Sequence, residues 1–148
     1  MTLDVEDLRA KAEAGSTAAQ SILGIALLEG VQATRDPEEA FRWLSAASGK
    51  GAARAMFHLG TMYEQGLVVA PDPVRARSLY EGAAERGDFH ACVSLARLLR
   101  SGKCGPCDDP AALRWYQAAA SQADRVSDCP ELREARAFLA SCGVGGAG

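Results

Sequence analysis

The sequence predicts an all-α protein, a right-handed α-solenoid of about three helix pairs with a capping helix at each end. Three observations predict this fold. Glycines recur 36 residues apart, Asp-Pro pairs recur at nearly the same interval, and apolar residues follow the three- and four-residue spacing of amphipathic helices. A fixed period of this length is typical of stacked helical repeats. We therefore expect seven to eight helices and no β-sheet.

The first helix of each repeat is expected between two glycines that recur with the 36-residue period. The three repeats are placed at about residues 15–50, 51–86 and 87–123. Their first helices are expected at residues 17–29, 53–65 and 89–101. Each ends at a glycine, because glycine takes the left-handed conformation of a helix C-terminus without steric cost: Gly30, Gly66 and Gly102.

The second helix of each repeat begins at an Asp-Pro pair. Aspartate caps the free N–H groups of a helix, and proline suits the first helical position because its missing donor would be unpaired there. The pairs are Asp36-Pro37, Asp72-Pro73 and Asp109-Pro110. The third pair comes one residue late, which predicts a longer third loop. The helices are expected to end near residues 48, 85 and 122.

Small residues within the first helices predict close helix packing. Gly24 and Gly60 lie mid-helix, where glycine costs about 1 kcal/mol relative to alanine. The compensating benefit is room for the partner helix, and Ala96 continues the series. The core is expected to consist mainly of Leu23, Leu59, Leu95, Trp43 and Leu79.

The ends of the chain are expected to cap the solenoid. Residues 5–14 predict a truncated second helix, with Leu8 lying 36 residues before Leu44. Residues 130–142 predict a fourth helix of the first-helix type, which begins at Pro130 and covers repeat 3. We interpret residues 1–142 as a single domain and expect the glycine-rich residues 143–148 to be disordered.

The repeat unit resembles the Sel1-like repeat, a relative of the tetratricopeptide repeat. The matching features are Leu-Gly in the first helix, a tyrosine and glycine after it, Asp-Pro, Ala-x-x-Trp at residues 40–43, and a closing Ala-Ala-x-x-Gly. Repeat 3 departs most, since Ala96 replaces the glycine. The resemblance covers roughly residues 14–123. It implies a protein–protein interaction module, an adaptor, scaffold or inhibitor of a partner protein, that is not an enzyme and needs no cofactor.

The resemblance also implies a concave groove lined by the first helices. The expected groove residues are Ile25, Arg54, Phe57, Thr61, Glu64, His90, Val93, Arg97 and Arg100. Three of them, Ile25, Phe57 and Val93, would form an apolar strip beside the cationic side chains. Such a groove suits a peptide with an acidic group or a free carboxylate. The alternative is that the arginines only solvate helix surfaces.

Cys104-Gly105-Pro106-Cys107 carries the only sharp chemical motif. The tetrapeptide matches thioredoxins, whose reactive cysteine follows a β-strand at a helix N-terminus, but here it lies between two helices. A plain loop is the simpler interpretation, and a redox pair or redox-switched binder is the alternative. Zinc is not expected, because Cys129 and Cys142 do not form a second closely spaced pair. Cys92 is expected to be a small packed residue.

Composition disfavours other classes of function. The net charge of −3 offers no basic excess for nucleic acid. No nucleophilic elbow, phosphate loop or paired-histidine metal motif is present in the sequence. No apolar stretch is long enough to span a bilayer. The N-terminal residues lack the features of a signal peptide, so a cytoplasmic location is expected.

Overall fold

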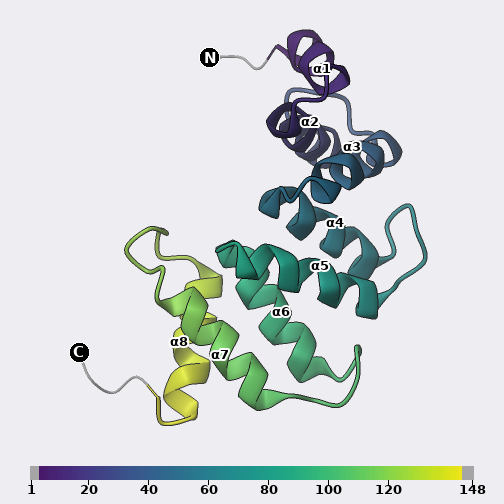
Figure 1. The fold of residues 1–148 in the computed structure, drawn as a ribbon. Helices are drawn as coiled ribbons and strands as arrows, with labels where there is room; N and C mark the ends of the chain where they lie inside the picture. The colour runs from purple at the N-terminus through teal and green to yellow at the C-terminus, as the bar shows by residue number, and fades with distance from the viewer. Residues whose placement is uncertain (1–3, 145–148) are drawn as a thin grey trace.

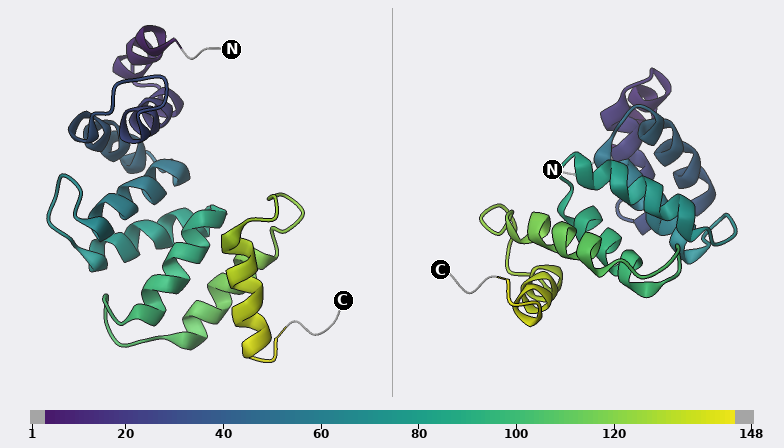
Figure 2. Two further views of the ribbon diagram at one scale, coloured as in Figure 1. Left: turned by 180° about the vertical axis from the view of Figure 1, so that it is seen from behind. Right: turned by 60° about the horizontal axis from the view of Figure 1, so that its bottom comes forward.

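The computed structural model describes residues 4–144, and within that range it contains eight α-helices and no β-strand (Figure 1). The helices are α1 (Val5–Glu13), α2 (Thr17–Glu29), α3 (Pro37–Gly49), α4 (Ala53–Gln65), α5 (Pro73–Glu85), α6 (Phe89–Ser101), α7 (Asp109–Ala120) and α8 (Pro130–Ser141). The predicted helical content is confirmed. Each helix packs mainly against its neighbours in the chain. As a result, α1 and α8 lie at opposite ends of the molecule (Figures 1 and 2).

The first helices, α2, α4 and α6, have the predicted bounds. Each is followed by a glycine in the left-handed region, with φ of 72° at Gly30, 71° at Gly66 and 73° at Gly102. This conformation reverses the chain toward the second helix of the repeat. A side chain at these positions would be strained by the positive φ alone.

Aspartates 36 residues apart cap the second helices. The prediction that Asp109 begins the third of these helices as its cap is wrong. Asp36, Asp72 and Asp108 accept hydrogen bonds from the backbone N–H three residues later, at 3.0, 3.0 and 2.9 Å. The cap of α7 is therefore Asp108, and Asp109 is the first helical residue. Proline at the second helical position is tolerated because the first-turn N–H groups have no intrahelical acceptor. The third loop has the same length as the other two, not a greater one.

The core forms where the first and second helices of a repeat cross. A Cβ added to Gly24 would lie 2.7 Å from the side chain of Leu44, and one added to Gly60 would lie 2.9 Å from the ring of Tyr80. The predicted close approach is confirmed. Leu23, Leu59 and Leu95 are buried as predicted.

The predicted core positions of the second helices are displaced by one residue. Trp43 and Leu79 are only partly buried, whereas Leu44 and Tyr80 are 0% and 1% exposed. One residue turns a side chain by about 100° around a helix, so only the residue facing the glycine reaches the centre of the core. Tyr116 occupies the same position in repeat 3 and is fully buried.

Both predicted capping helices are present as α1 and α8. Gln20 of α2 donates a hydrogen bond to the carbonyl oxygen of Ala12 at 3.1 Å, which ties α1 to repeat 1. At the other end, the rings of Tyr116 and Phe138 lie 4.8 Å apart. Two residues of the tail that was expected to be disordered, 143 and 144, are ordered, because Val144 N–H donates to Leu139 O at 2.9 Å and closes α8. Residues 145–148 lie outside the described residues.

Candidate protein-binding surface

The centre of the predicted groove is a cluster of rings on α4 and α6. The ring of Phe57 lies 5.0 Å from His58, 5.8 Å from His90 and 6.0 Å from Tyr80, measured between centroids. Phe57, His58 and His90 are each partly exposed. Burial lowers the pKa of His58 below its ordinary value, and the positive charge of Arg54 lowers this pKa further. At neutral pH the cluster therefore presents an uncharged His58 to solvent.

Arg54 lies beside this cluster and is the most available of the predicted cations. Its guanidinium is 3.6 Å from the carboxylate of Asp88, and its side chain is 53% exposed. Asp88 is meanwhile engaged as the N-cap of α6, where it accepts a hydrogen bond from Ala91 N at 2.9 Å. At 3.6 Å the Arg54–Asp88 ion pair is long. Arg54 can therefore turn toward an external anion while Asp88 keeps its capping hydrogen bond.

Two predicted groove residues, Thr61 and Glu64, are partly exposed and also hydrogen-bond a buried core side chain. The hydroxyl of Tyr80 donates to Glu64 Oε2 at 2.7 Å and lies 3.2 Å from Thr61 Oγ1. Thr61 also donates to Phe57 O at 3.1 Å. Burial raises the pKa of Tyr80, so this hydroxyl stays protonated and continues to donate. The two residues satisfy a buried phenol that would otherwise lose a hydrogen bond.

Val93 does not belong to the groove. Its side chain is 0% exposed and lies in the larger core cluster. Helix α6 contacts α5, α7 and α8, and these neighbours enclose Val93. The predicted apolar strip is therefore interrupted at this residue. The remaining apolar member, Ile25, lies on α2 and lines a separate hollow between α1 and α2.

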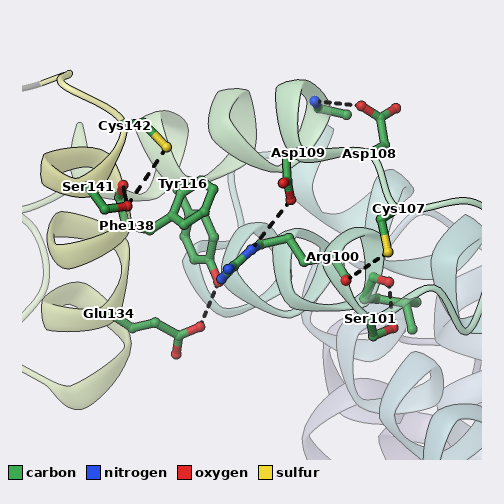
Figure 3. A network of polar contacts seen from close by, with 12 residues as sticks. Arg100, Ser101, Cys107, Asp108, Asp109, Tyr116, Glu134, Phe138, Ser141 and Cys142 are labelled. Carbon is green, nitrogen blue, oxygen red and sulfur yellow. Dashed lines mark hydrogen bonds and ion pairs between the residues drawn. The ribbon is translucent and has the colours of Figure 1, made fainter.

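The predicted cationic end of the groove is engaged by α8. The guanidinium of Arg97 forms a bidentate pair with Glu134, with Nε 2.8 Å from Oε2. Tyr116 donates to the same carboxylate at 2.6 Å (Figure 3). The hydrogen bonds from Arg97 lower the pKa of Glu134. Sequence reasoning missed Glu134, although the helix predicted at residues 130–142 was already expected to cover repeat 3.

Arg100 is engaged in the same region by two contacts. Figure 3 shows it between Asp109 and the ring of Phe138. Its Nε lies 3.6 Å from Asp109 Oδ1, and its guanidinium carbon lies 4.2 Å from the centroid of the Phe138 ring. A cation over an aromatic face at this distance is attracted by the ring. Arg97 and Arg100 therefore stabilise the docking of α8, and neither is an uncommitted anion site.

The two cysteines of the 104–107 loop cap the C-terminus of α6. The thiol of Cys104 lies 3.7 Å from Leu98 O, a carbonyl that also accepts the hydroxyl of Ser101 at 2.7 Å. The thiol of Cys107 lies 3.2 Å from Arg100 O (Figure 3). In repeats 1 and 2 the carbonyls equivalent to Leu98 O, those of Ala26 and Met62, accept backbone N–H groups instead. All five cysteines have free thiols. Cys92 is buried, as expected, and burial raises its pKa to about 11.

Neither metal ligation nor membrane insertion finds support in the described part of the chain. Residues 4–144 contain no group of three or more His, Cys, Asp or Glu side chains that could hold a metal ion. Over the same residues, every helix is too short or too polar to cross a bilayer.

Comparison with known protein families decides the identity of the repeat. The Sel1 repeat model matches residues 17–51, 53–88 and 90–124. The chain belongs to the Sel1-repeat family. Each matched segment holds one first helix and one second helix, so α1 and α8 are half repeats outside the three Sel1 matches. Sel1 repeats generally form protein-interaction modules, and their fold is a scaffold for binding.

Solved Sel1 structures share this arrangement. A Sel1 repeat protein from Oxalobacter formigenes is 33% identical with a TM-score of 0.77, and the alignment covers 93% of this chain and 98% of that one. The protective antigen c5321 of uropathogenic Escherichia coli is 28% identical with a TM-score of 0.79; 93% of this chain aligns with 28% of the antigen. Cysteine rich protein B of Helicobacter pylori, at 22% identity, TM-score 0.69 and coverage of 93% and 98%, shares the fold. No curated protein sequence matches the chain.

Proposed function

We propose that this chain is a non-catalytic module that binds a peptide or protein surface on the face formed by α4 and α6. The observation that carries the proposal is the partly exposed ring cluster of Phe57, His58 and His90. Aromatic side chains at the centre of a surface are frequent energetic anchors of interfaces. The Sel1 repeat scaffold supports the same interpretation, because solenoids use extended faces for binding.

The charge around the cluster suggests the chemistry of the partner. Arg97 is held by Glu134, which leaves Arg54 as the exposed cation next to the rings. A partner segment with an apolar or aromatic side chain and one adjacent carboxylate matches this surface. A strongly acidic peptide matches it less well, since only one arginine is available. We therefore propose a partner segment that is mainly apolar and carries a single anionic group, in place of the generally acidic peptide expected from the sequence.

The cysteines support a cytoplasmic location and a binding function. Five free thiols are typical of a reducing compartment. The capping contacts of Cys104 and Cys107 account for both residues without a redox reaction. We therefore propose binding alone and do not assign a thiol–disulfide activity.

Selection of a displayed random-peptide library on the intact chain tests the proposal. Enriched peptides are assayed by calorimetry against Arg54→Glu and His90→Ala. We expect each change to weaken binding by about tenfold or more, as for anchor residues of an interface. Both side chains are partly or largely exposed, so the fold should persist, which circular dichroism checks.

Arg114→Glu is the matched control for Arg54→Glu. Arg114 is an exposed arginine on α7, a second helix, and it lies outside the ring cluster. The same charge reversal there should leave peptide affinity unchanged. If the enriched peptides bind Arg54→Glu and His90→Ala as tightly as the unmodified chain, the binding surface is elsewhere and the proposal fails.

A further inference from the structure

A hollow of about 640 Å³ lies between α1 and α2 at the N-terminal end of the solenoid. Apolar side chains line it, and two of them are unusually exposed for large hydrophobic residues: Ile22 at 46% and Val31 at 54%. Acidic side chains, Asp4, Asp7 and Glu29, also lie along it. An exposed apolar surface bordered by charge is typical of an interaction site.

The repeat phase indicates which kind of helix would pack into this hollow. Residue 8 of α1 is equivalent to Leu44 of α3, which packs against Gly24 of the preceding first helix. Asp4 and Lys11 are exposed, whereas their equivalents Ala40 and Ala47 are 0% exposed beneath α2. Within the described residues, α1 has the phase of a second helix and no first helix precedes it; the hollow lies where the repeat phase would place such a helix.

At the opposite end of the described residues, the exposed helix is of the other type. Helix α8 is a first helix that no second helix follows within the described residues. Four side chains form a stripe along its exposed side: Arg133, Arg136, Ala137 and Ala140. The four equivalent residues of α6, 44 positions earlier, are all buried: Phe89, Cys92, Val93 and Ala96. In α6 this side is covered, whereas in α8 it is open.

We propose that a second copy of this chain docks its α8 into the hollow between α1 and α2. The two half repeats would then form one complete repeat across the junction. Ala140 is the counterpart of Gly24, Gly60 and Ala96, so it would meet Leu8 of the other copy at the same kind of close crossing that Gly24 makes with Leu44. A small residue is what this crossing requires.

The charges of the two surfaces are complementary. The stripe on α8 carries Arg133 and Arg136, and the hollow carries Asp4 and Glu29 in addition to the paired Asp7 and Lys11. Arg133 is within 2.9 Å of Asp128 in its own chain, whereas Arg136 interacts with that carboxylate only through a longer-range charge interaction and is the more available cation of the stripe. Opposite charges of this kind favour the encounter and set the register.

The contact is heterologous, because it joins two different surfaces. Figure 2 shows α1 and α8 at opposite ends, so one copy can engage a neighbour at each end. Head-to-tail contacts that do not close into a ring produce open chains. The inference goes beyond the proposed function, since the ring cluster on α4 and α6 is not part of either docking surface.

Analytical ultracentrifugation of the intact chain tests this self-association. We expect the weight-average mass to rise with concentration and to fall when salt is added, because salt screens the charges. Ile22→Glu should abolish association from the hollow side, and Ala140→Glu should abolish it from the α8 side. Both residues are exposed, so each variant should keep the circular dichroism spectrum of the unmodified chain.

Val74→Glu is the matched control, because Val74 is 65% exposed on α5 and lies on neither surface. It should associate like the unmodified chain. Mixing the two defective variants gives the decisive result. Ile22→Glu keeps an intact α8 surface and Ala140→Glu keeps an intact hollow, so together they should form a 1:1 dimer that grows no further.

Three outcomes overturn the proposal. One is an unmodified chain that remains monomeric at about 1 mM, a concentration that reveals even weak contacts. Another is association that neither variant reduces. The last is a mixture of the two variants that stays monomeric, since a head-to-tail contact must form between one intact hollow and one intact α8.

Discussion

The ring of Tyr80 lies where a side chain at Gly60 would be, with two ring carbons 2.9 Å from the position of the missing Cβ. The glycine therefore lets the first and second helices of repeat 2 cross at close range. Tyr80 is 1% exposed and its hydroxyl is bound by Glu64, so the ring has little freedom to move away.

Replacing this glycine should destabilise the protein. Gly60→Ala gains about 1 kcal/mol of helix propensity, but overpacking of a core costs about 1–3 kcal/mol. We expect a net loss of about 1 kcal/mol in the free energy of unfolding, measured with urea. Gly49→Ala is the control, because no heavy atom lies within 4 Å of its added Cβ and its helical backbone accepts alanine. It should stabilise by about 0.4–1 kcal/mol, and equal effects at both sites would contradict the packing argument.

The Arg97–Glu134 pair should make stability depend on pH in acid. Arg97 lowers the pKa of Glu134 in the folded state below the ordinary value of 4.5. The contribution is therefore complete above that value and is lost as the pH falls below it. Glu134→Gln should cost about 0.5–1 kcal/mol at neutral pH, a small figure because both side chains are partly exposed. The difference from the unmodified protein should shrink in acid. Glu85→Gln, at an exposed position on α5, should show no such trend.

His58 should add a second pH dependence, nearer to neutrality. Burial lowers its pKa in the folded state below the ordinary value of 6.5. The unfolded chain then binds a proton more readily, so stability is lost as the pH falls through 6.5 toward the folded-state pKa. We expect stability to decrease as the pH falls from 7 through 6.5, and a flatter profile in His58→Gln. Titration of the His58 ring by NMR measures the pKa directly, and a value at or above 6.5 would refute this account.

Thiol reactivity should follow burial. Cys107 and Cys142 are exposed, whereas Cys92 is 1% exposed with a pKa raised to about 11. An aromatic disulfide reagent should modify the two exposed thiols quickly, because the thiolate is the reactive form and it must be accessible. Cys92 should react only after unfolding. Mass spectrometry of peptides after brief labelling identifies the sites, and early labelling of Cys92 would show that α6 opens readily.

The loop cysteines should be replaceable by another donor. Cys104→Ser with Cys107→Ser should change stability by less than about 1 kcal/mol, because the hydroxyls can still donate to the carbonyls of Leu98 and Arg100. Alanine at both positions removes the thiol donors and should cost more, by about 0.5 kcal/mol, since the hydroxyl of Ser101 still donates to Leu98 O at 2.7 Å. Urea unfolding under reducing conditions compares the two variants. Equal stability of the serine and alanine variants would show that the thiols do not cap α6.

The residues that were predicted correctly act through local chemistry. Gly30, Gly66 and Gly102 end their helices because of backbone conformation, and the 36-residue period repeats this effect. The misplaced α7 cap had a different cause. Asp108 and Asp109 are both good capping residues, and the adjacent proline suggested the wrong one. The 36-residue phase alone would have selected Asp108.

The candidate site was less predictable, because exposure depends on neighbours that periodicity does not reveal. Val93 occupies a groove position by alignment, yet three helices enclose it. The sequence suggests that Arg97 and Arg100 are available surface cations. In the structure, Glu134 of α8 binds Arg97, and the ring of Phe138 of α8 packs against Arg100. Phe57 and His90, two of the expected groove residues, lie on adjacent first helices with their rings 5.8 Å apart.

The sequence by itself determined where the helices begin and end and how the repeats follow one another, because caps, glycines and apolar spacing act within a few residues. The tertiary structure alone decided which side chains remain available. The one-residue difference between Trp43 and Leu44 is a rotation of about 100°, and only the packed partner helix shows which of the two faces the core. The open sides of α1 and α8, the first and last helices of the described residues, likewise become apparent only when the buried positions of one repeat are compared with the exposed positions of another.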